Sequence, residues 1–332
     1  MHMNPFWCIK DQRIRTLDCT IRDGGLVNDH RFTLDFVRAL YRANIEAGVD
    51  YMEIGYKNSD RIFSRDENGP WKFCDEKDIR AVVEDSPSTK MKLSCMIDAA
   101  KSDWKTAVAP CAESPLDMIR VAFYEYQLDE AVAMIEDAKE KGYEVSANLM
   151  AVTVVPERRL DEVLERVCNT RTNAVVIVDS FGSLTPIQTE YLTKKYLSYA
   201  EPLGIEVGMH AHNNLQLAFA NTFLSAQYGA TRLDCSLGGL GRGAGNCPSE
   251  YLLSVLNPGA YKLRPLYQCL QDEVVPLRQI IDWGTYNEYA ITAQFNVHPR
   301  SAIAHRKSPE TRDKYAVLYD KLTEEMRNQE TP

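Results

Sequence analysis

Short strand-like runs alternate with amphipathic helical patterns about eight times between residues 14 and 237. One helical pattern, residues 33–47, carries an apolar stripe between a capping Thr33 and a terminating Gly48. Eight βα units in about 250 residues predict an α/β protein folded as a TIM (β/α)8 barrel. The predicted strands cover residues 14–22, 50–56, 92–97, 117–123, 143–150, 174–179, 204–212 and 232–237.

A doubly wound open sheet is the alternative to the barrel. The barrel is favoured because no GxGxxG follows the first strand and because several strands carry polar residues on one face. Residues 260–332 lack strand signals and have a helical character. We therefore expect a barrel domain over residues 10–259 and a C-terminal helical domain over residues 260–332.

Charge and cysteine usage exclude several kinds of protein. The net charge is −9, and no Lys/Arg block interrupts it, so binding to nucleic acid is not expected. No apolar run is long enough to span a membrane, and the N-terminus lacks a signal-peptide layout. The nine cysteines are scattered and never form CxxC, which is typical of reduced thiols. We expect a cytoplasmic protein.

The seventh predicted strand, residues 204–212, ends in two histidines separated by one residue. Side chains alternate along a strand, so His210 and His212 point the same way, into the barrel mouth. Two imidazoles at the carboxyl end of one strand are suited to binding a metal ion. The alternative is that both histidines are simply packed or solvated.

The first strand supplies further polar groups. Alternation over residues 14–22 predicts an outward face of Leu17, Cys19 and Ile21 and an inward face of Asp18, Thr20 and Arg22. Asp23 follows where this strand ends. An inward arginine needs an anion, and Glu53 on the second strand is one candidate. The alternative is a structural Arg22–Glu53 ion pair, with Asp23 capping a loop.

Together these residues define a site of one carboxylate and two imidazoles, formed by Asp23, His210 and His212. Mixed oxygen and nitrogen ligands without thiolate favour Mn²⁺, Mg²⁺ or Co²⁺. A glycine-rich loop, residues 236–248, follows the eighth strand. It is either a mobile connector or an active-site loop; in the latter case Asn246 is a further candidate ligand.

Further contacts with substrate are expected at the ends of two strands. Gly241 and Gly243 allow the backbone of the glycine-rich loop to approach a ligand closely. Asp179 and Ser180 end the sixth strand and face the predicted mouth. The alternative for Asp179 is that it caps a helix over residues 185–198.

Four motifs, in this order, resemble the DRE-TIM metallolyases. They are Thr20-Ile21-Arg22-Asp23-Gly24, Glu53, His210-Ala211-His212-Asn213 and the loop from Gly239 to Asn246. The resemblance is strongest to the 4-hydroxy-2-oxovalerate aldolases within that family. It implies metal ligands Asp23, His210 and His212, an enolate stabilised by Arg22, and a tail tyrosine, here Tyr289, as acid. Glu53 would fix the direction of Arg22.

The resemblance also implies substrates and partners. It implies cleavage or formation of a C–C bond through an enolate held at a divalent metal, with an α-keto acid and an aldehyde as substrates. It also implies that the helical tail serves to form a homodimer or to dock an acylating aldehyde dehydrogenase. Two alternatives remain open: an acyl-CoA-dependent Claisen synthase or lyase, and a barrel that only binds a partner.

One departure from the family concerns the general base. The aldolases usually carry a histidine two positions after Asp-Gly, where this chain has Leu26. We expect Tyr289, His298 or a metal-bound hydroxide to take over proton transfer, with Tyr289 preferred. His30 is expected to belong to the start of the following helix. An apolar Leu26 favours an acceptor bulkier or less polar than acetaldehyde.

Overall fold

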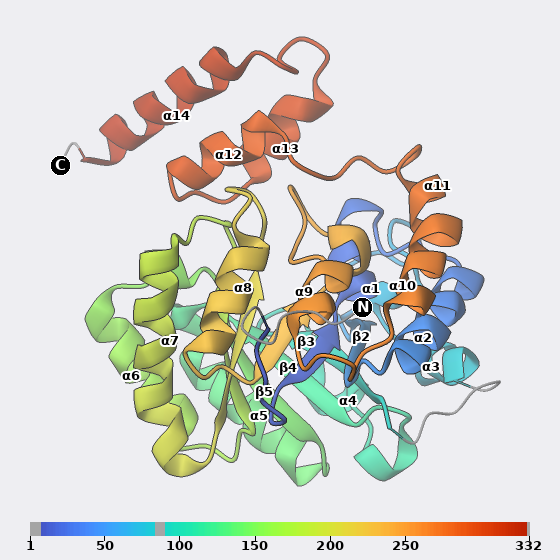
Figure 1. Cartoon of the computed structure of the whole chain (residues 1–332). Helices are drawn as coiled ribbons and strands as arrows, with labels where there is room; N and C mark the ends of the chain where they lie inside the picture. Colours follow the sequence, from blue (N-terminus) through green and yellow to red (C-terminus); the bar gives the residue numbers. More distant parts are fainter. Residues whose placement is uncertain (1–7, 84–89, 331–332) are drawn as a thin grey trace.

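A closed barrel of eight parallel strands forms the body of the protein, which confirms the predicted TIM barrel (Figure 1). The computed structural model describes residues 8–83 and 90–330. Each strand pairs with its neighbours in chain order, and pairing of Arg15 with Arg232 closes the barrel between the first and last strands. The strands are β1 Arg15–Asp18, β2 Tyr51–Tyr56, β3 Lys92–Asp98, β4 Met118–Phe123, β5 Glu144–Leu149, β6 Ala174–Asp179, β7 Glu206–Ala211 and β8 Arg232–Cys235.

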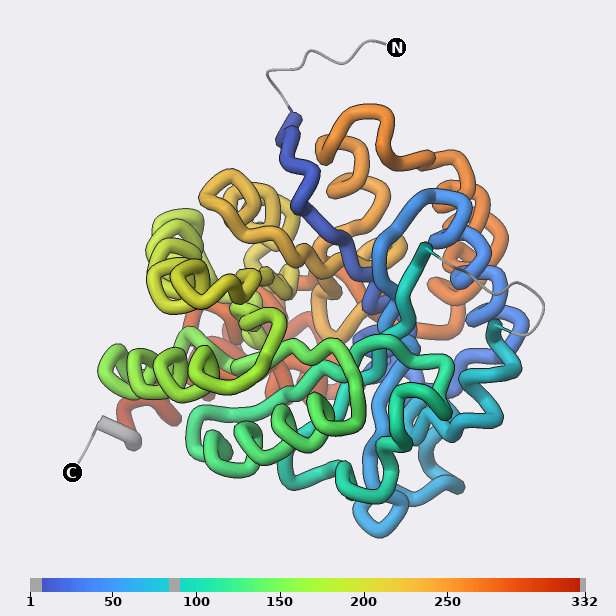
Figure 2. The backbone as a smooth tube through the Cα atoms, turned by 90° about the horizontal axis from the view of Figure 1, so that it is seen from below, coloured from blue at the N-terminus to red at the C-terminus, as the bar shows by residue number. Residues whose placement is uncertain are grey.

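Helices surround this barrel on the outside (Figure 2). The helix predicted over residues 33–47 is α2, which begins after Thr33 and ends before Gly48. Thr33 accepts a hydrogen bond from the backbone N–H of Phe36, and Gly48 has a φ of 86°, which favours glycine. The helices of the barrel are α1 Thr20–Gly24, α2 Leu34–Ala47, α3 Glu76–Val83, α4 Trp104–Ala107, α5 Leu128–Glu140, α6 Glu157–Cys168, α7 Pro186–Ala200, α8 Ala218–Gln227 and α9 Ser249–Val255.

The prediction for the first strand was wrong in its length and in its facing. β1 ends at Asp18, and Arg22 and Asp23 lie in the short helix α1. Leu17 faces the barrel interior, where it packs with Tyr51 and Met118. Alternation therefore does not describe residues 19–23, because the chain turns into a helix as soon as it leaves the sheet.

Charged side chains fill part of the barrel interior. Arg120 on β4 donates to Glu53 on β2, with an N–O distance of 3.0 Å, and to Asp234 on β8, at 2.5 Å. Arg22 donates to the same Glu53 oxygen at 2.7 Å. All four side chains are buried. Because unpaired charges are costly inside a protein, these ion pairs hold the four side chains in place in the barrel interior, below the mouth.

The helices after residue 260 form two groups, α10–α11 and α12–α14, with α12–α14 at one end of the barrel in Figure 1. Leu266, Val274 and Trp283 belong to the main barrel core. Side chains of α12–α14 pack in a separate apolar cluster with Ala244 of the glycine-rich loop. The domain boundary at residues 259/260 stays a prediction. The bounds are α10 Leu263–Cys269, α11 Val275–Leu277, α12 Asn287–Gln294, α13 Arg300–Lys307 and α14 Tyr315–Glu330.

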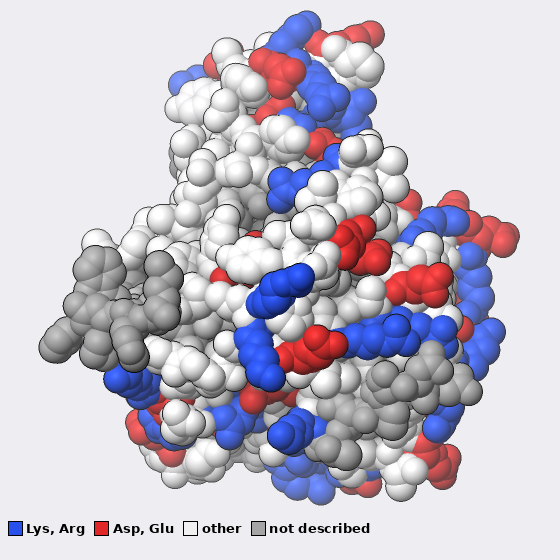
Figure 3. Space-filling view, turned by 45° about the vertical axis from the view of Figure 1, so that its right-hand side comes forward, with Lys and Arg blue, Asp and Glu red and all other residues white. Residues whose placement is uncertain are grey.

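Acidic and basic side chains are interspersed over the face drawn in Figure 3. Mixing of both signs weakens the long-range field of such a face. Within the described part of the chain, no helix combines the length and the apolar character needed to cross a membrane.

Replacing Arg120 by leucine should destabilise the barrel. The substitution leaves the buried carboxylates of Glu53 and Asp234 with one partner fewer, so we expect the free energy of unfolding to fall by about 3–5 kcal/mol. Denaturant titration measures this loss. The matched control is Arg171→Leu, which breaks an ion pair with Glu136 on the surface and should cost less than about 1 kcal/mol. Equal losses would contradict a special role for Arg120.

Candidate active site

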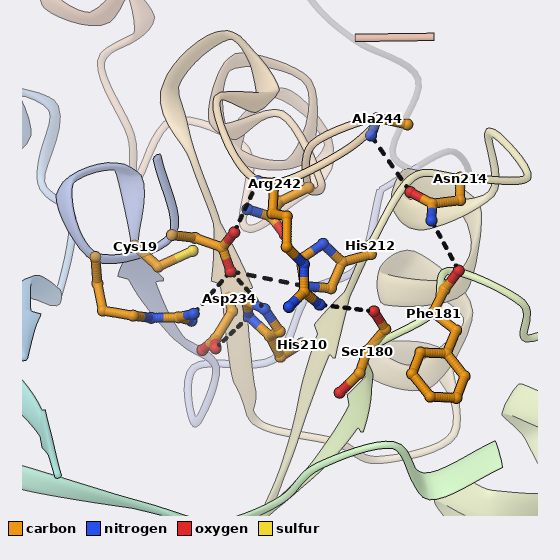
Figure 4. Close-up of polar contacts among 12 residues, drawn as sticks. Cys19, Ser180, Phe181, His210, His212, Asn214, Asp234, Arg242 and Ala244 are labelled. Atoms are coloured by element: carbon orange, nitrogen blue, oxygen red, sulfur yellow. Dashed lines mark hydrogen bonds and ion pairs between the residues drawn. The ribbon is translucent and has the colours of Figure 1, made fainter. Parts of the chain in front are cut away.

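Asp23, His210 and His212 converge at the carboxyl end of the barrel. Asp23 comes from α1, His210 lies on β7, and His212 follows that strand directly. Oδ2 of Asp23 lies 3.3 Å from Nε2 of His210 and 3.6 Å from Nε2 of His212. All three side chains are buried, and their candidate ligand atoms lie within 4.8 Å of one another. Figure 4 shows the two histidine rings close together.

The orientation of His210 fits a metal ligand. Its Nδ1 lies 2.9 Å from Oδ2 of Asp234, as drawn in Figure 4, while its Nε2 is buried without a hydrogen-bond partner. A neutral imidazole that donates through Nδ1 presents a lone pair at Nε2. Oδ1 of Asn246 is likewise buried without a partner. This set of oxygen and nitrogen donors fits a divalent cation.

The electrostatics of these groups agree with a cation site. Burial opposes ionisation of Asp23, but the neighbouring His212 and Arg22 hold its pKa well below the usual range. Burial keeps the pKa of His212 well below its usual value, so this ring is neutral. Burial also acts against a charge on His210, but the nearby carboxylates of Asp23 and Asp234 raise its pKa overall. The negative charge of Asp23 and Asp234 favours a proton on His210, and the same negative charge favours a metal cation at this place.

Arg22 lies beside the three candidate ligands Asp23, His210 and His212, called here the metal-ligand set, and is fixed by two carboxylates. Its Nε donates to Glu53 and its Nη1 donates to Asp23, both at 2.7 Å. The side chain is buried yet still lines the central cavity. The predicted Arg22–Glu53 ion pair therefore exists, and the same pair aims the guanidinium at the space beside Asp23.

The glycine-rich loop closes over Asp23. The backbone N–H of Arg242 donates to Oδ1 of Asp23 at 3.0 Å. A Cβ on Gly241 would lie 2.3 Å from Nδ2 of Asn246 and 3.1 Å from Oδ1 of Asp23, so no larger residue fits without movement. Gly243 has a φ of 66° and lies near Asn214 and Tyr289. Both glycines shape the loop, and neither lines the cavity.

The cavity at the barrel mouth encloses about 530 Å³ of empty space, including its opening to solvent. One part of its wall is apolar and consists of Leu26, Tyr56, Met96, Ala122 and Met150, which pack together. The other lining residues are Arg22, Asp23, Asp98, Tyr124, Asn148, Val178, Ser180, His210, His212 and Arg242. The site thus combines a charged end with an apolar wall.

Two of the predicted tail residues do not line this cavity. Tyr289 is buried in the cluster formed by α12–α14, where burial raises its pKa to about 12. Nε2 of His298 lies 3.1 Å from Nη1 of Arg242. Burial lowers the pKa of His298 to about 3. The tail therefore reaches the cavity through Arg242, which also donates to the carbonyl oxygen of Ser180 (Figure 4).

Asp179 and Ser180 both make backbone contacts in the loops above the barrel. Asp179 accepts hydrogen bonds from the backbone N–H groups of Ser183 and Leu184, in the loop that precedes α7. Asp179 does not line the cavity, whereas Ser180 does. The Oγ atom of Ser180 accepts a hydrogen bond from the N–H of Ala151.

Sequence reasoning missed several residues of this site. Asp98, Arg120 and Asp234 occupy inward positions of β3, β4 and β8, and strand alternation could have found them. Arg242 could not be assigned from a loop pattern. His30 lies before α2 and outside any helix, with its ring against Gly25 and edge-on to Tyr56.

The fold and the site define a TIM barrel with a carboxylate–histidine group that could hold a metal ion, as expected for a metallolyase. A profile of the HMGL-like family matches residues 13–263. The chain belongs to the HMGL-like family, and its function is that of an aldolase-type carbon–carbon lyase.

Individual relatives agree with this assignment. The chain is 32% identical to a 4-hydroxy-2-oxovalerate aldolase of Bacillus thuringiensis (strain Al Hakam), over 91% of this chain and 89% of the relative. It superposes on the N-terminal domain of a candidate aldolase from Bacteroides vulgatus with a TM-score of 0.73 and 26% identity, covering 90% of this chain and 98% of that one. HMG-CoA lyase from Brucella melitensis shares the fold, with a TM-score of 0.65 and 18% identity over 80% of this chain and 99% of that one.

Removing either histidine should strongly weaken metal binding without unfolding the barrel. We expect His210→Ala and His212→Ala each to weaken Mn²⁺ binding by about a hundredfold or more, because each removes one of three ligands. Isothermal titration with Mn²⁺ measures the affinity, and circular dichroism checks the fold. His305→Ala, on α13, is the control and should bind as the unaltered protein does. Unchanged affinity in both site variants would refute the assignment.

Proposed function

We propose that this protein catalyses the reversible aldol cleavage of a 4-hydroxy-2-oxo acid into pyruvate and an aldehyde, with Mn²⁺, Mg²⁺ or Co²⁺ as cofactor. The single observation that carries the proposal is the convergence of Asp23, His210 and His212 beside Arg22 in one cavity. The names of the curated relatives support the substrate class.

Asp23, His210 and His212 would hold the metal, with Asn246 as a further candidate ligand. A divalent cation bound there would supply Lewis-acid polarisation of the keto acid. Arg22 contributes fixed positive charge where the enolate oxygen develops, and a preorganised donor of this kind is worth roughly 3–4 kcal/mol. Glu53 and Asp23 hold Arg22 in that direction and so reduce its reorganisation during the reaction.

The apolar wall around Leu26 supports an acceptor aldehyde with some apolar surface. Leu26 packs against Tyr56, Met96 and Ala122, and together they exclude water from that side of the cavity. Excluding water also strengthens the charge interactions of Arg22. The wall therefore favours an aldehyde at least as large as acetaldehyde.

Partners and location belong to the same proposal. A homodimer and docking of an acylating aldehyde dehydrogenase agree with exposed apolar side chains on α14, such as Val317 and Tyr319. Trp283 and Tyr289, two aromatic residues of the tail, are buried and so do not offer contact area. Nine free cysteines agree with a reducing compartment such as the cytoplasm.

The aldolase and the acyl-CoA-dependent alternative differ in one product. With 4-hydroxy-2-oxovalerate and Mn²⁺ but no coenzyme A, we expect pyruvate to be released, which lactate dehydrogenase and NADH report by absorbance. Thiol release from acetyl-CoA in the presence of a 2-oxo acid, without aldol cleavage, would instead identify a Claisen synthase.

Arg22→Lys should separate catalysis from metal binding. Lysine keeps the positive charge but loses the planar fork that joins Glu53 and Asp23, so we expect kcat to fall about 10²–10³-fold. Mn²⁺ affinity should change little, because the three ligands remain. The control is Arg171→Lys on the surface. Turnover near that of the unaltered protein would mean that Arg22 is purely structural.

A further inference from the structure

We propose that Asp98 is the general base of the aldol cleavage and accepts the proton of the substrate's 4-hydroxyl group through Oδ1. The inference rests on the proposed function and adds a catalytic residue to it. Asp98 ends β3 and lines the same cavity as Arg22 and the metal-ligand set.

One oxygen of Asp98 is committed and the other is free. Oδ2 accepts from Nζ of Lys101 at 2.7 Å. Oδ1 is buried and has no hydrogen-bond partner. A buried carboxylate oxygen without a donor is unfavourable in a folded protein unless a ligand supplies one. A substrate hydroxyl in the cavity is such a donor.

The surrounding contacts hold Asp98 in place. Its backbone N–H donates to Oγ of Ser102, which in turn donates to Asn58. Its register partner on β4 is Ala122, which belongs to the apolar wall. Asp98 therefore lies next to the surface on which the aldehyde part of the substrate would pack.

Elimination among the ionisable residues that line the cavity also leads to Asp98. These residues are Arg22, Asp23, Tyr56, Asp98, Tyr124, His210, His212 and Arg242. The arginines are always protonated and cannot act as bases. Tyr56 and Tyr124 carry phenolic hydroxyls, which are donors at neutral pH. With Asp23 and the two histidines assigned to the metal, Asp98 is the remaining proton acceptor.

The charges around Asp98 suit a base of moderate strength. Burial raises the pKa of Asp98, whereas Lys101, Lys72 and Arg22 act in the opposite direction. A raised pKa brings a carboxylate closer to the value at which it exchanges protons efficiently near neutral pH.

The protons and electrons of the aldol cleavage balance with substrate, Asp98 and water alone. The 4-hydroxyl proton moves to Oδ1 of Asp98 as the C3–C4 bond breaks, and C4 becomes the aldehyde carbon. The bonding electrons pass to the C2 carbonyl and give the enolate of pyruvate, beside Arg22. The enolate then takes a proton from water at C3, and Asp98 returns its own proton to solvent.

The test uses two reactions that share the enolate but differ in the need for this base. Cleavage of 4-hydroxy-2-oxovalerate requires removal of a hydroxyl proton, whereas decarboxylation of oxaloacetate to pyruvate does not. With Mn²⁺ present, we expect Asp98→Asn to lower kcat for cleavage about 10²-fold or more and to leave decarboxylation within about threefold. Asp103→Asn, in the following loop and outside the cavity lining, is the matched control.

The outcomes separate this inference from the proposed function. Cleavage that persists in Asp98→Asn overturns the role of Asp98. Loss of both reactions in that variant also overturns it, because Asp98 would then maintain the site rather than move a proton. If the unaltered protein performs neither reaction, the proposed function itself fails.

Discussion

The ion pairs around Arg22 and Arg120 are the interaction on which both the barrel and the site depend. Arg22 and Arg120 both donate to Glu53. Arg22 also donates to Asp23, and Arg120 also donates to Asp234. Asp234 then contacts His210. The contacts that fix the barrel interior thus extend without a break to the candidate metal ligands. Arg120 therefore supports the barrel interior and, through Asp234, also the orientation of His210.

The charge count of the network agrees with the proposed cofactor and substrate. Three carboxylates, on Asp23, Glu53 and Asp234, face only two guanidinium groups, so the network carries one net negative charge when its histidines are neutral. A divalent cation would reverse that sign. A singly charged 2-oxo acid would then bring the site to neutrality, which lowers the cost of burying all of these groups.

The barrel could be predicted because its signal is spread over eight repeated units and does not depend on any one residue. The facing of β7 was also predictable, since regular alternation extends through His210 to His212. Alternation failed after Asp18, where the chain leaves the sheet and α1 begins. The partners Arg120 and Asp234 come from strands distant in sequence, and only closure of the barrel brings them together. Tyr289 was chosen on its sequence neighbours, which carry no information about the direction of its side chain.

The short helix α1 places Arg22 and Asp23 on adjacent residues, and this limits how the gene can change. Successive residues of an α-helix are about 100° apart, so inserting or deleting one residue between Thr20 and Arg22 would turn both side chains away from β7 together. Loops on the outer surface tolerate changes in length, because the direction of a site residue does not depend on the number of residues in them. In α1 the exact number of residues, as well as their identity, is part of the site.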